Sequence, residues 1–243
     1  MSRQPHLLVE SEDIHDTVLL PGDPGRVKRI AGHCDESTLV AENREYHLVN
    51  ARYQETPLTI CSTGIGSPSA AIAMEELLKV GATTFIRVGT TGALQAGMGI
   101  GDLVIPTGAG KDEGTTKRYE SPTIPAVPDF DIVAGLVEAA SDRPRPVHVG
   151  PIVTDDAFYA ETEAYVADWE AAGLLAVEME AAALFTLARR AGCAAGAICT
   201  VDGNLVEGTQ KGETSDNEEL PEDARDAIDV AIEIALDAAV TVG

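Results

Sequence analysis

The chain has 243 residues, enough for one α/β domain with a full core. No Pro-, Gly- or Ser-rich linker divides it, so we predict a single domain over residues 1–243. Forty acidic residues against 17 Lys and Arg give a formal net charge of −23, which excludes nonspecific attraction to nucleic acid or to an anionic membrane surface. Lysine supplies only five of the 17 cations and aromatic residues are only 4% of the chain, a composition typical of proteins that stay soluble in high salt.

The N-terminal segment carries Glu10, Glu12 and Asp13 where a signal peptide would be apolar, and no run of 18 apolar residues follows. We therefore expect a soluble cytoplasmic protein with no membrane partner. Four cysteines lack the spacing of metal ligands, so we predict reduced thiols in the core and no metal site. These cysteines are Cys34, Cys61, Cys193 and Cys199.

Apolar runs between turn residues predict strands at 18–20, 46–52, 58–62, 83–88, 102–106, 147–154 and 195–201. Helical spacing and capping residues predict helices at 24–31, 68–80, 131–140, 161–172, 178–190 and 221–239. We expect Asp23 and Ser67 to cap the first two helices, each with proline at its first position, and an acidic loop at 207–222. The alternation predicts a layered α/β fold, and the early hairpin predicts a central mixed sheet flanked by helices.

Two glycine-rich turns after predicted strands indicate an anion site. In the first, Gly22 and Arg26 flank the start of a helix, where backbone N–H groups favour a phosphate. In the second, Arg87 ends a strand before Gly89 and Gly92, which would let backbone N–H groups approach a ligand. The stretch GIGSPS at 64–69 is similar to a dinucleotide fingerprint, so NADP binding, with Arg87 on a 2′-phosphate, stays an alternative.

Carboxylates after two further predicted strands have two readings each. Glu178 and Glu180 flank Met179 at a helix start, where a carboxylate pair accepts hydrogen bonds from the two hydroxyls of a sugar, or complements the helix dipole. Asp202 ends the last strand before a glycine, and carboxylates there either face a pocket or cap a turn.

Eight sequence blocks carry a more specific signal together than any one of them alone. In chain order they are PGDPGRV, NREY, STGIGSPSAAIAMEELL, RVGTTGALQ, PAVPDFD, FY, VEMEAAAL and ICTVDG. This series resembles the nucleoside phosphorylases of the uridine/purine phosphorylase superfamily, from His6 to about Leu205 and again in the C-terminal helix.

The resemblance implies a role for individual residues of this chain. The implied phosphate contacts are Gly22, Arg26, Arg87 and Thr90, with Arg44 supplied by a neighbouring subunit. The implied ribose contacts are Met179 and Glu180, with Glu178 beside them and His6 reaching the 5′-hydroxyl from the partner. Phe158 is implied to pack against the base. Each active site would then need two chains, and the family's dimers usually assemble into hexamers.

The implied reaction is attack of inorganic phosphate on the anomeric carbon of a ribonucleoside, giving free base and ribose 1-phosphate without a cofactor. Arginines including Arg87 would hold the nucleophile, so that positioning and electrostatics carry the catalysis. The uridine branch reads uracil with Gln and Arg shortly after Phe-Tyr, whereas this chain has AETEA at 160–164.

Asp202 fits the purine branch, in which such an acid donates a proton to purine N7. We therefore favour a purine nucleoside. Uridine stays the alternative, because STGIGSPS and RVGTTGALQ are more similar to the uridine branch. A nucleosidase that uses water is a third reading, disfavoured by the three arginines.

Overall fold

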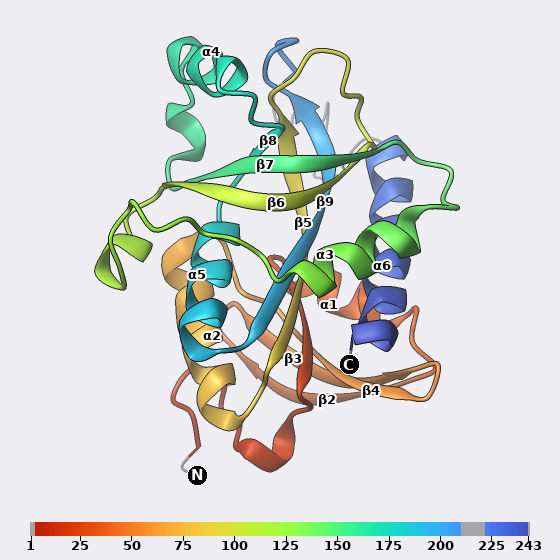
Figure 1. The fold of residues 1–243 in the computed structure, drawn as a ribbon. Coiled ribbons are helices and arrows are strands. Elements are labelled where there is room, and N and C mark those ends of the chain that lie inside the picture. Colours follow the sequence, from red (N-terminus) through yellow and green to blue (C-terminus); the bar gives the residue numbers. More distant parts are fainter. Residues whose placement is uncertain (1–2, 210–221, 243) are drawn as a thin grey trace.

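The computed structural model describes residues 3–209 and 222–242, which form one layered α/β domain around a nine-stranded mixed sheet (Figure 1). The strands are β1 (Thr17–Pro21), β2 (Glu36–Asn43), β3 (Tyr46–Tyr53), β4 (Thr56–Cys61), β5 (Thr84–Ala93), β6 (Leu103–Asp112), β7 (Val147–Asp155), β8 (Ala176–Glu178) and β9 (Ala194–Asn204). The helices are α1 (Pro24–Ala31), α2 (Ser67–Val80), α3 (Phe130–Ala140), α4 (Glu163–Ala171), α5 (Ala181–Ala191) and α6 (Glu222–Val242). The predicted fold class is confirmed.

The sheet closes on itself at one end. Its order is β2-β3-β4-β1-β5-β8-β7-β6-β9, and β9 also pairs with β5, so the last five strands form a ring. β1 runs parallel to β4 and β5, and β5 runs parallel to β9, while β2, β3 and β4 are antiparallel neighbours. The carboxyl ends of β1 and β4 therefore meet at one edge, beside the later residues of β5 and β9. Ligands bind at such an edge in α/β sheets.

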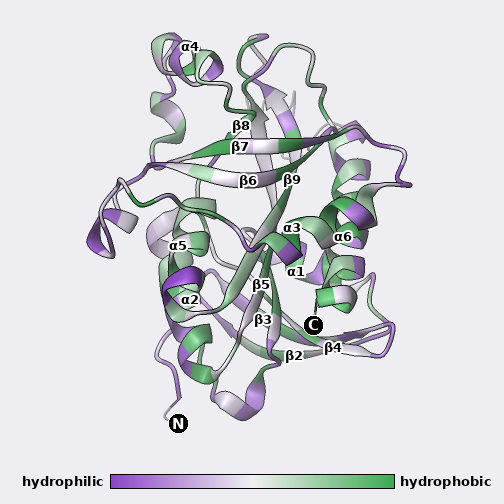
Figure 2. Cartoon of the chain, viewed as in Figure 1, coloured by the Kyte–Doolittle hydropathy of each residue, from purple (hydrophilic) through white to green (hydrophobic). Residues whose placement is uncertain are grey.

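Helices cover both faces of the sheet and create two cores. α2 and α5 pack together on one face, and α3 and α6 pack together on the other with α1 nearby (Figure 1). Side chains alternate along β5, so Phe85 faces α2 and α5 while Ile86 and Val88 face α6. Figure 2 shows hydrophobic residues along the central strands and hydrophilic ones at the outer turns. Arg87 shares the Phe85 side of β5, which directs a cation toward the start of α5.

Several local predictions are confirmed at the level of single caps. The Asp23 side chain accepts a hydrogen bond from the Gly25 N–H at the start of α1. Gly81 ends α2 with a left-handed φ of 109°. The predicted loop at 207–222 and the start of the last helix at Pro221 lie mostly outside the described residues.

Three local predictions are wrong or incomplete. Gly66, with φ of 89°, is the N-cap of α2, because the Ser67 hydroxyl instead donates to the Met179 carbonyl at 2.9 Å. β5 continues past Arg87 to Ala93, because its glycine-rich end pairs with β9 and is not a turn. β2 was not predicted, since it is an edge strand whose mostly exposed residues show no apolar alternation.

Candidate active site

A cavity of about 620 Å³ opens at this edge of the sheet. Its walls come from the turns after β1 and β4, the second half of β5, the β8–α5 junction and β9. The predicted site residues that line it are Gly22, Arg26, Arg87, Thr90, Phe158, Glu178, Met179, Glu180 and Asp202. Segments from most of the chain length thus converge on one cavity.

Arg87 is the buried cation of this cavity. Its side chain is 4% exposed, its Nε donates to Glu178 Oε2 at 3.0 Å, and its Nη2 pairs with Glu180 Oε2. Burial opposes the guanidinium charge, but Glu180 and Glu178 outweigh it and raise the pKa of Arg87 above its ordinary value. The third nitrogen, Nη1, is buried and has no hydrogen-bond partner in the described part of the chain. A buried donor of this kind is stabilised by an anionic acceptor.

Arg26 brings a second positive charge to the same place. Its Nη1 donates to the Val88 carbonyl at 3.3 Å, next to Arg87 in β5. Burial and the charge of Arg87 lower the pKa of Arg26. Asp23 and Asp202 act on Arg26 in the opposite direction, and an anion between the two guanidinium groups would further relieve their repulsion. Gly22, after β1, and Thr90, in β5, also line the cavity.

Gly89 makes room for Arg87 to fold back along its own strand. A Cβ added at Gly89 would lie 2.9 Å from Arg87 Nη2 and 3.1 Å from Cys199 Sγ. The glycine is therefore required by the arginine, in addition to any approach of a ligand to the backbone. Gly92 does not line the cavity and pairs instead with Val177 and Gly203 in the sheet.

Glu178 and Glu180 differ in what they contact. The Glu178 carboxylate is buried and accepts from Arg87 Nε, Thr154 Oγ1 at 2.6 Å, and the backbone N–H groups of Glu180 and Ala181. It therefore caps α5 and orients Arg87. Glu180, the N-cap residue of α5, accepts from the Gly66 N–H at 2.6 Å and pairs with Arg87. Sequence reasoning missed Thr154, which carries no local signal.

Asp202 occupies a β-bulge. Thr91 pairs with Val201 and Gly92 pairs with Gly203, so Asp202 is the extra residue of β9 at this point. A bulge redirects the side chain of the inserted residue, and Asp202 lines the cavity while remaining only 8% exposed. Three residues earlier in β9, burial raises the pKa of the Cys199 thiol to about 12, so this thiol is neutral near pH 7.

The four cysteines are free thiols. Cys61 and Cys199 are buried, as predicted, whereas Cys34 and Cys193 are only partly buried. In the described ranges, no group of three or more His, Cys, Asp or Glu side chains is arranged to hold a metal ion.

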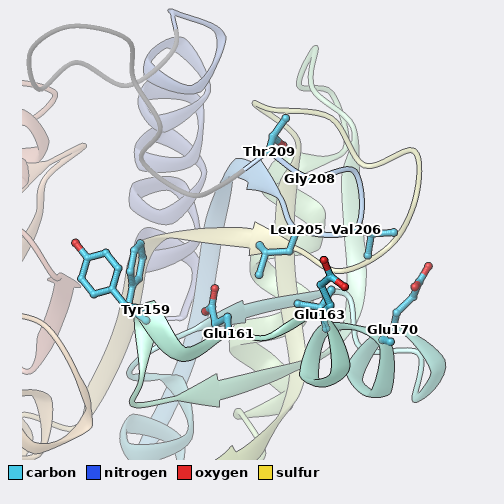
Figure 3. Close-up of a pocket in the computed structure, with 11 residues that line it drawn as sticks. Tyr159, Glu161, Glu163, Glu170, Leu205, Val206, Gly208 and Thr209 are labelled. Carbon is cyan, nitrogen blue, oxygen red and sulfur yellow. The ribbon is translucent and has the colours of Figure 1, made fainter.

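Phe158 stands between this cavity and a neighbouring one of about 540 Å³. The neighbouring cavity is bounded by residues before and within α4 on one side and by residues after β9 on the other (Figure 3). Figure 3 shows Glu161 on this wall between Tyr159 and Glu163, with its carboxylate on the same side as Leu205. Phe158, which we predict to contact the base, therefore lines both cavities, and the second cavity is also lined by acidic and apolar side chains.

His6 and Arg44 lie outside the cavity of their own chain. Arg44 is exposed in the two-residue turn between β2 and β3, where its φ is 55°. The adjacent Asn43 donates from Nδ2 to the His6 carbonyl at 2.8 Å, so the two segments lie side by side. Glu45, the next residue of the turn, lines the cavity. The segments of the two residues predicted to act on a neighbouring subunit therefore lie side by side, next to a residue that lines the cavity.

The chain is similar to known proteins over most of its length. Residues 16–240 match the family model of the phosphorylase superfamily. The chain belongs to the phosphorylase superfamily. It is 64% identical over 238 residues to a guanosine phosphorylase of Halorubrum lacusprofundi, with 98% of each chain covered. It is 42% identical over 216 residues to a uridine phosphorylase of Thermococcus kodakarensis, covering 84% of this chain and 78% of that one.

The fold of this chain is similar to solved structures of nucleoside phosphorylases. A uridine phosphorylase of Vibrio fischeri superposes with a TM-score of 0.90 at 34% identity, covering 99% of this phosphorylase and 98% of that chain. A purine nucleoside phosphorylase of Toxoplasma gondii, solved with immucillin-H, gives a TM-score of 0.91 at 28% identity, covering 100% and 97%. The prediction that this chain is a nucleoside phosphorylase, and thus a pentosyltransferase, is confirmed. None of these relatives supports the alternative of NADP binding. No helix in the described ranges is long and apolar enough to cross a membrane.

Proposed function

We propose that this phosphorylase catalyses reversible phosphorolysis of a purine nucleoside, with guanosine as its preferred substrate, in the cytoplasm. The observation that carries the proposal is that two cations, Arg26 and Arg87, and the carboxylate of Asp202 line one cavity. The 64% identity to a guanosine phosphorylase over nearly the full length of both chains supports the choice of base.

Inorganic phosphate occupies the arginine end in this proposal. Arg87 Nη1 and Arg26 bind its oxygens, Gly22 and Thr90 complete the contacts, and Arg44 of a neighbouring subunit adds a third guanidinium. Phosphate binding between fixed cations orients an oxygen toward the anomeric carbon without reorganisation during the reaction. A nucleosidase would need no such anion site, so the three arginines favour phosphorolysis over hydrolysis.

The ribose lies over the β8–α5 junction, in contact with Met179 and Glu180. A carboxylate accepts hydrogen bonds from hydroxyl groups, and we assign Glu180, which also contacts Gly66 and Arg87, to the 2′- and 3′-hydroxyls. Glu178 has four different donors around its carboxylate, so we assign it to positioning Arg87 and α5. His6 of a neighbouring subunit reaches the 5′-hydroxyl, which makes the enzyme a dimer at least, and we propose a hexamer built from such dimers.

The base packs on Phe158, with Asp202 at N7. As the glycosidic bond between C1′ and N9 breaks, electrons move into the purine and a proton passes from the Asp202 carboxyl to N7. Guanine presents its N1–H and 2-amino group side by side, and a carboxylate accepts from both. Glu161, beyond Phe158 in the second cavity, is the carboxylate we assign to this edge (Figure 3).

The experiment measures the rate of base release from guanosine, inosine, adenosine and uridine in molar salt, with and without phosphate. We expect phosphate-dependent release, fastest from guanosine. Phosphate-independent release would make the enzyme a nucleosidase, and faster release from uridine would move it to the uridine branch. Asp202→Asn should lower turnover of guanosine by about 10²-fold, the scale of a lost general acid. Asp142→Asn, at an exposed carboxylate, is the matched control.

A further inference from the structure

Glu76 of α2 is a buried carboxylate outside the cavity. It is 3% exposed and is surrounded by donors from the N-terminal segment. The His6 backbone N–H donates to its oxygens at 3.1 and 3.2 Å, and the Leu7 N–H donates at 2.8 Å. His6 Nδ1 lies 2.6 Å from Oε1. Burying a carboxylate is costly unless several donors satisfy it, and here one segment supplies them all.

These contacts hold the imidazole ring of His6 in one orientation. Nδ1 faces Glu76, the ring packs edge-on to Tyr46 with centroids 6.4 Å apart, and Asn43 holds the His6 carbonyl at 2.8 Å. The His6 side chain is nevertheless 37% exposed. With Nδ1 engaged inside the chain, Nε2 is the ring nitrogen left for a group outside it.

We propose that Glu76 is a positioning residue for the reaction in the neighbouring subunit, acting through His6 on the 5′-hydroxyl of the nucleoside. A carboxylate only accepts hydrogen bonds, so the proton of a neutral His6 ring lies on Nδ1 and Nε2 is an acceptor. Nε2 then accepts from the 5′-hydroxyl of the ribose bound to the partner. This inference rests on the proposed function, in which His6 serves a neighbouring site.

A purely structural role for Glu76 makes a different prediction, and the 5′-hydroxyl separates the two. A variant that only lowers the fraction of folded enzyme would slow every substrate alike. A variant that misorients His6 would slow only nucleosides that carry the 5′-hydroxyl. The informative quantity is therefore the ratio of kcat/KM for guanosine to kcat/KM for 5′-deoxyguanosine, or for the corresponding uridine pair if the enzyme prefers uridine.

The test compares wild type with His6→Ala, Glu76→Gln and the double variant, using Glu75→Gln on the same helix as the control. Glu76→Gln should lower this ratio about tenfold, the scale of one lost hydrogen bond, with 5′-deoxyguanosine nearly unaffected. Because the two residues act as one unit, the double variant should resemble His6→Ala alone. An equal loss for both substrates in Glu76→Gln would overturn the inference.

Failure of the inference and failure of the proposed function are distinguishable. If His6→Ala leaves the ratio unchanged, the role proposed for His6 is wrong and the inference fails with it. If His6→Ala lowers the ratio while Glu76→Gln does not, only the inference fails. Should Glu76→Gln give little folded protein, Glu76→Asp keeps the charge, and it should lower the ratio less than His6→Ala does. A ratio equal to that of wild type in a folded Glu76→Asp that has lost activity on both substrates would contradict the inference.

Discussion

At the residue scale, Arg87 stabilises its surroundings and has a proposed role in the reaction. It pairs with the buried carboxylates of Glu178 and Glu180, and we propose that its remaining nitrogen, Nη1, binds phosphate. Truncation to alanine would leave two buried charges uncompensated, at a cost of about 3–5 kcal/mol, so an inactive alanine variant would not report on phosphate alone. A substitution that retains the charge is the more informative experiment.

We therefore predict the effect of Arg87→Lys. An ammonium group keeps the charge but cannot bridge two carboxylates and a phosphate as a guanidinium does. We expect kcat/KM for phosphate to fall by about 10²-fold or more while the protein stays folded. Steady-state kinetics with varied phosphate checks this, with Arg190→Lys on the outer side of α5 as the control. An unchanged kcat/KM for phosphate would remove Arg87 from the proposed anion site.

The second prediction at this scale concerns the base. Glu161→Gln replaces one acceptor of the carboxylate with a donor, which faces the 2-amino group or N1–H of guanine unfavourably. The preference for guanosine over inosine should fall by about tenfold, measured as the ratio of the two kcat/KM values. Glu163 lines the same cavity, so Glu163→Gln tests whether loss of a negative charge alone has this effect. Equal ratios in wild type and Glu161→Gln would show that Glu161 does not read guanine.

At the element scale, an ion-pair row ties α6 to the rest of the domain. Asp229, Glu233 and Asp237 recur at every fourth residue of α6. Arg29 of α1 pairs with Asp229 at 2.7 Å, and Arg143 pairs with Glu233 and Asp237 at 2.5 and 2.6 Å. The helix is thereby bound through charges as well as through its buried apolar face.

This row makes stability depend on acid. The hydrogen bond from Arg29, working against burial and aided by His33, lowers the pKa of Asp229 below its ordinary value of 3.8. A depressed pKa stabilises the folded state above pH 3.8, and this contribution disappears as the pH falls through the lower, folded-state pKa. Asp229→Asn should therefore be less stable than wild type at pH 7, with the difference shrinking below about pH 3.8. Urea unfolding at both pH values measures it, with Asp142→Asn as the control, and a difference independent of pH would contradict it.

At the scale of the whole molecule, the charge of −23 dominates. Forty carboxylates repel one another over a screening length of about 30 Å at 0.01 M salt, which falls to about 3 Å at 1 M. We expect the melting temperature to rise between these two salt concentrations. Sucrose, which is uncharged, separates screening from general stabilisation by a cosolute. A melting temperature that does not change with salt would show that this repulsion is not important to the fold.

The proposed sharing of the active site between two subunits gives a second prediction for the assembled molecule. Mixing His6→Ala with Asp202→Asn restores complete sites, because a cavity with Asp202 then receives His6 from the other variant. After equal mixing and full exchange in symmetric dimers, about a quarter of the sites should be complete. Activity is measured after native mass spectrometry has verified exchange. No recovery in a verified mixture would exclude the proposed sharing of His6.

Residues with a local signature could be assigned from the sequence alone. The Asp23 cap, the Gly81 helix end and the apolar runs predict most elements, because each depends on neighbours within one turn or one strand. Arg26 and Arg87 stand out as cations beside glycines, and the ordered motifs identify the family before any coordinates. β2 has exposed side chains without periodicity, so it could not be predicted.

The tertiary structure decided the contacts between residues distant in the chain. Glu178 meets Arg87 across 91 positions and Glu76 meets His6 across 70, and no local pattern encodes either pair. The ring closed by β9 and β5 turns the apparent glycine-rich turn after Arg87 into a strand and inserts Asp202 as a bulge. The residue types of the site follow from the sequence. Their orientation depends on strand pairing and buried charge compensation, which exist only once the chain has folded.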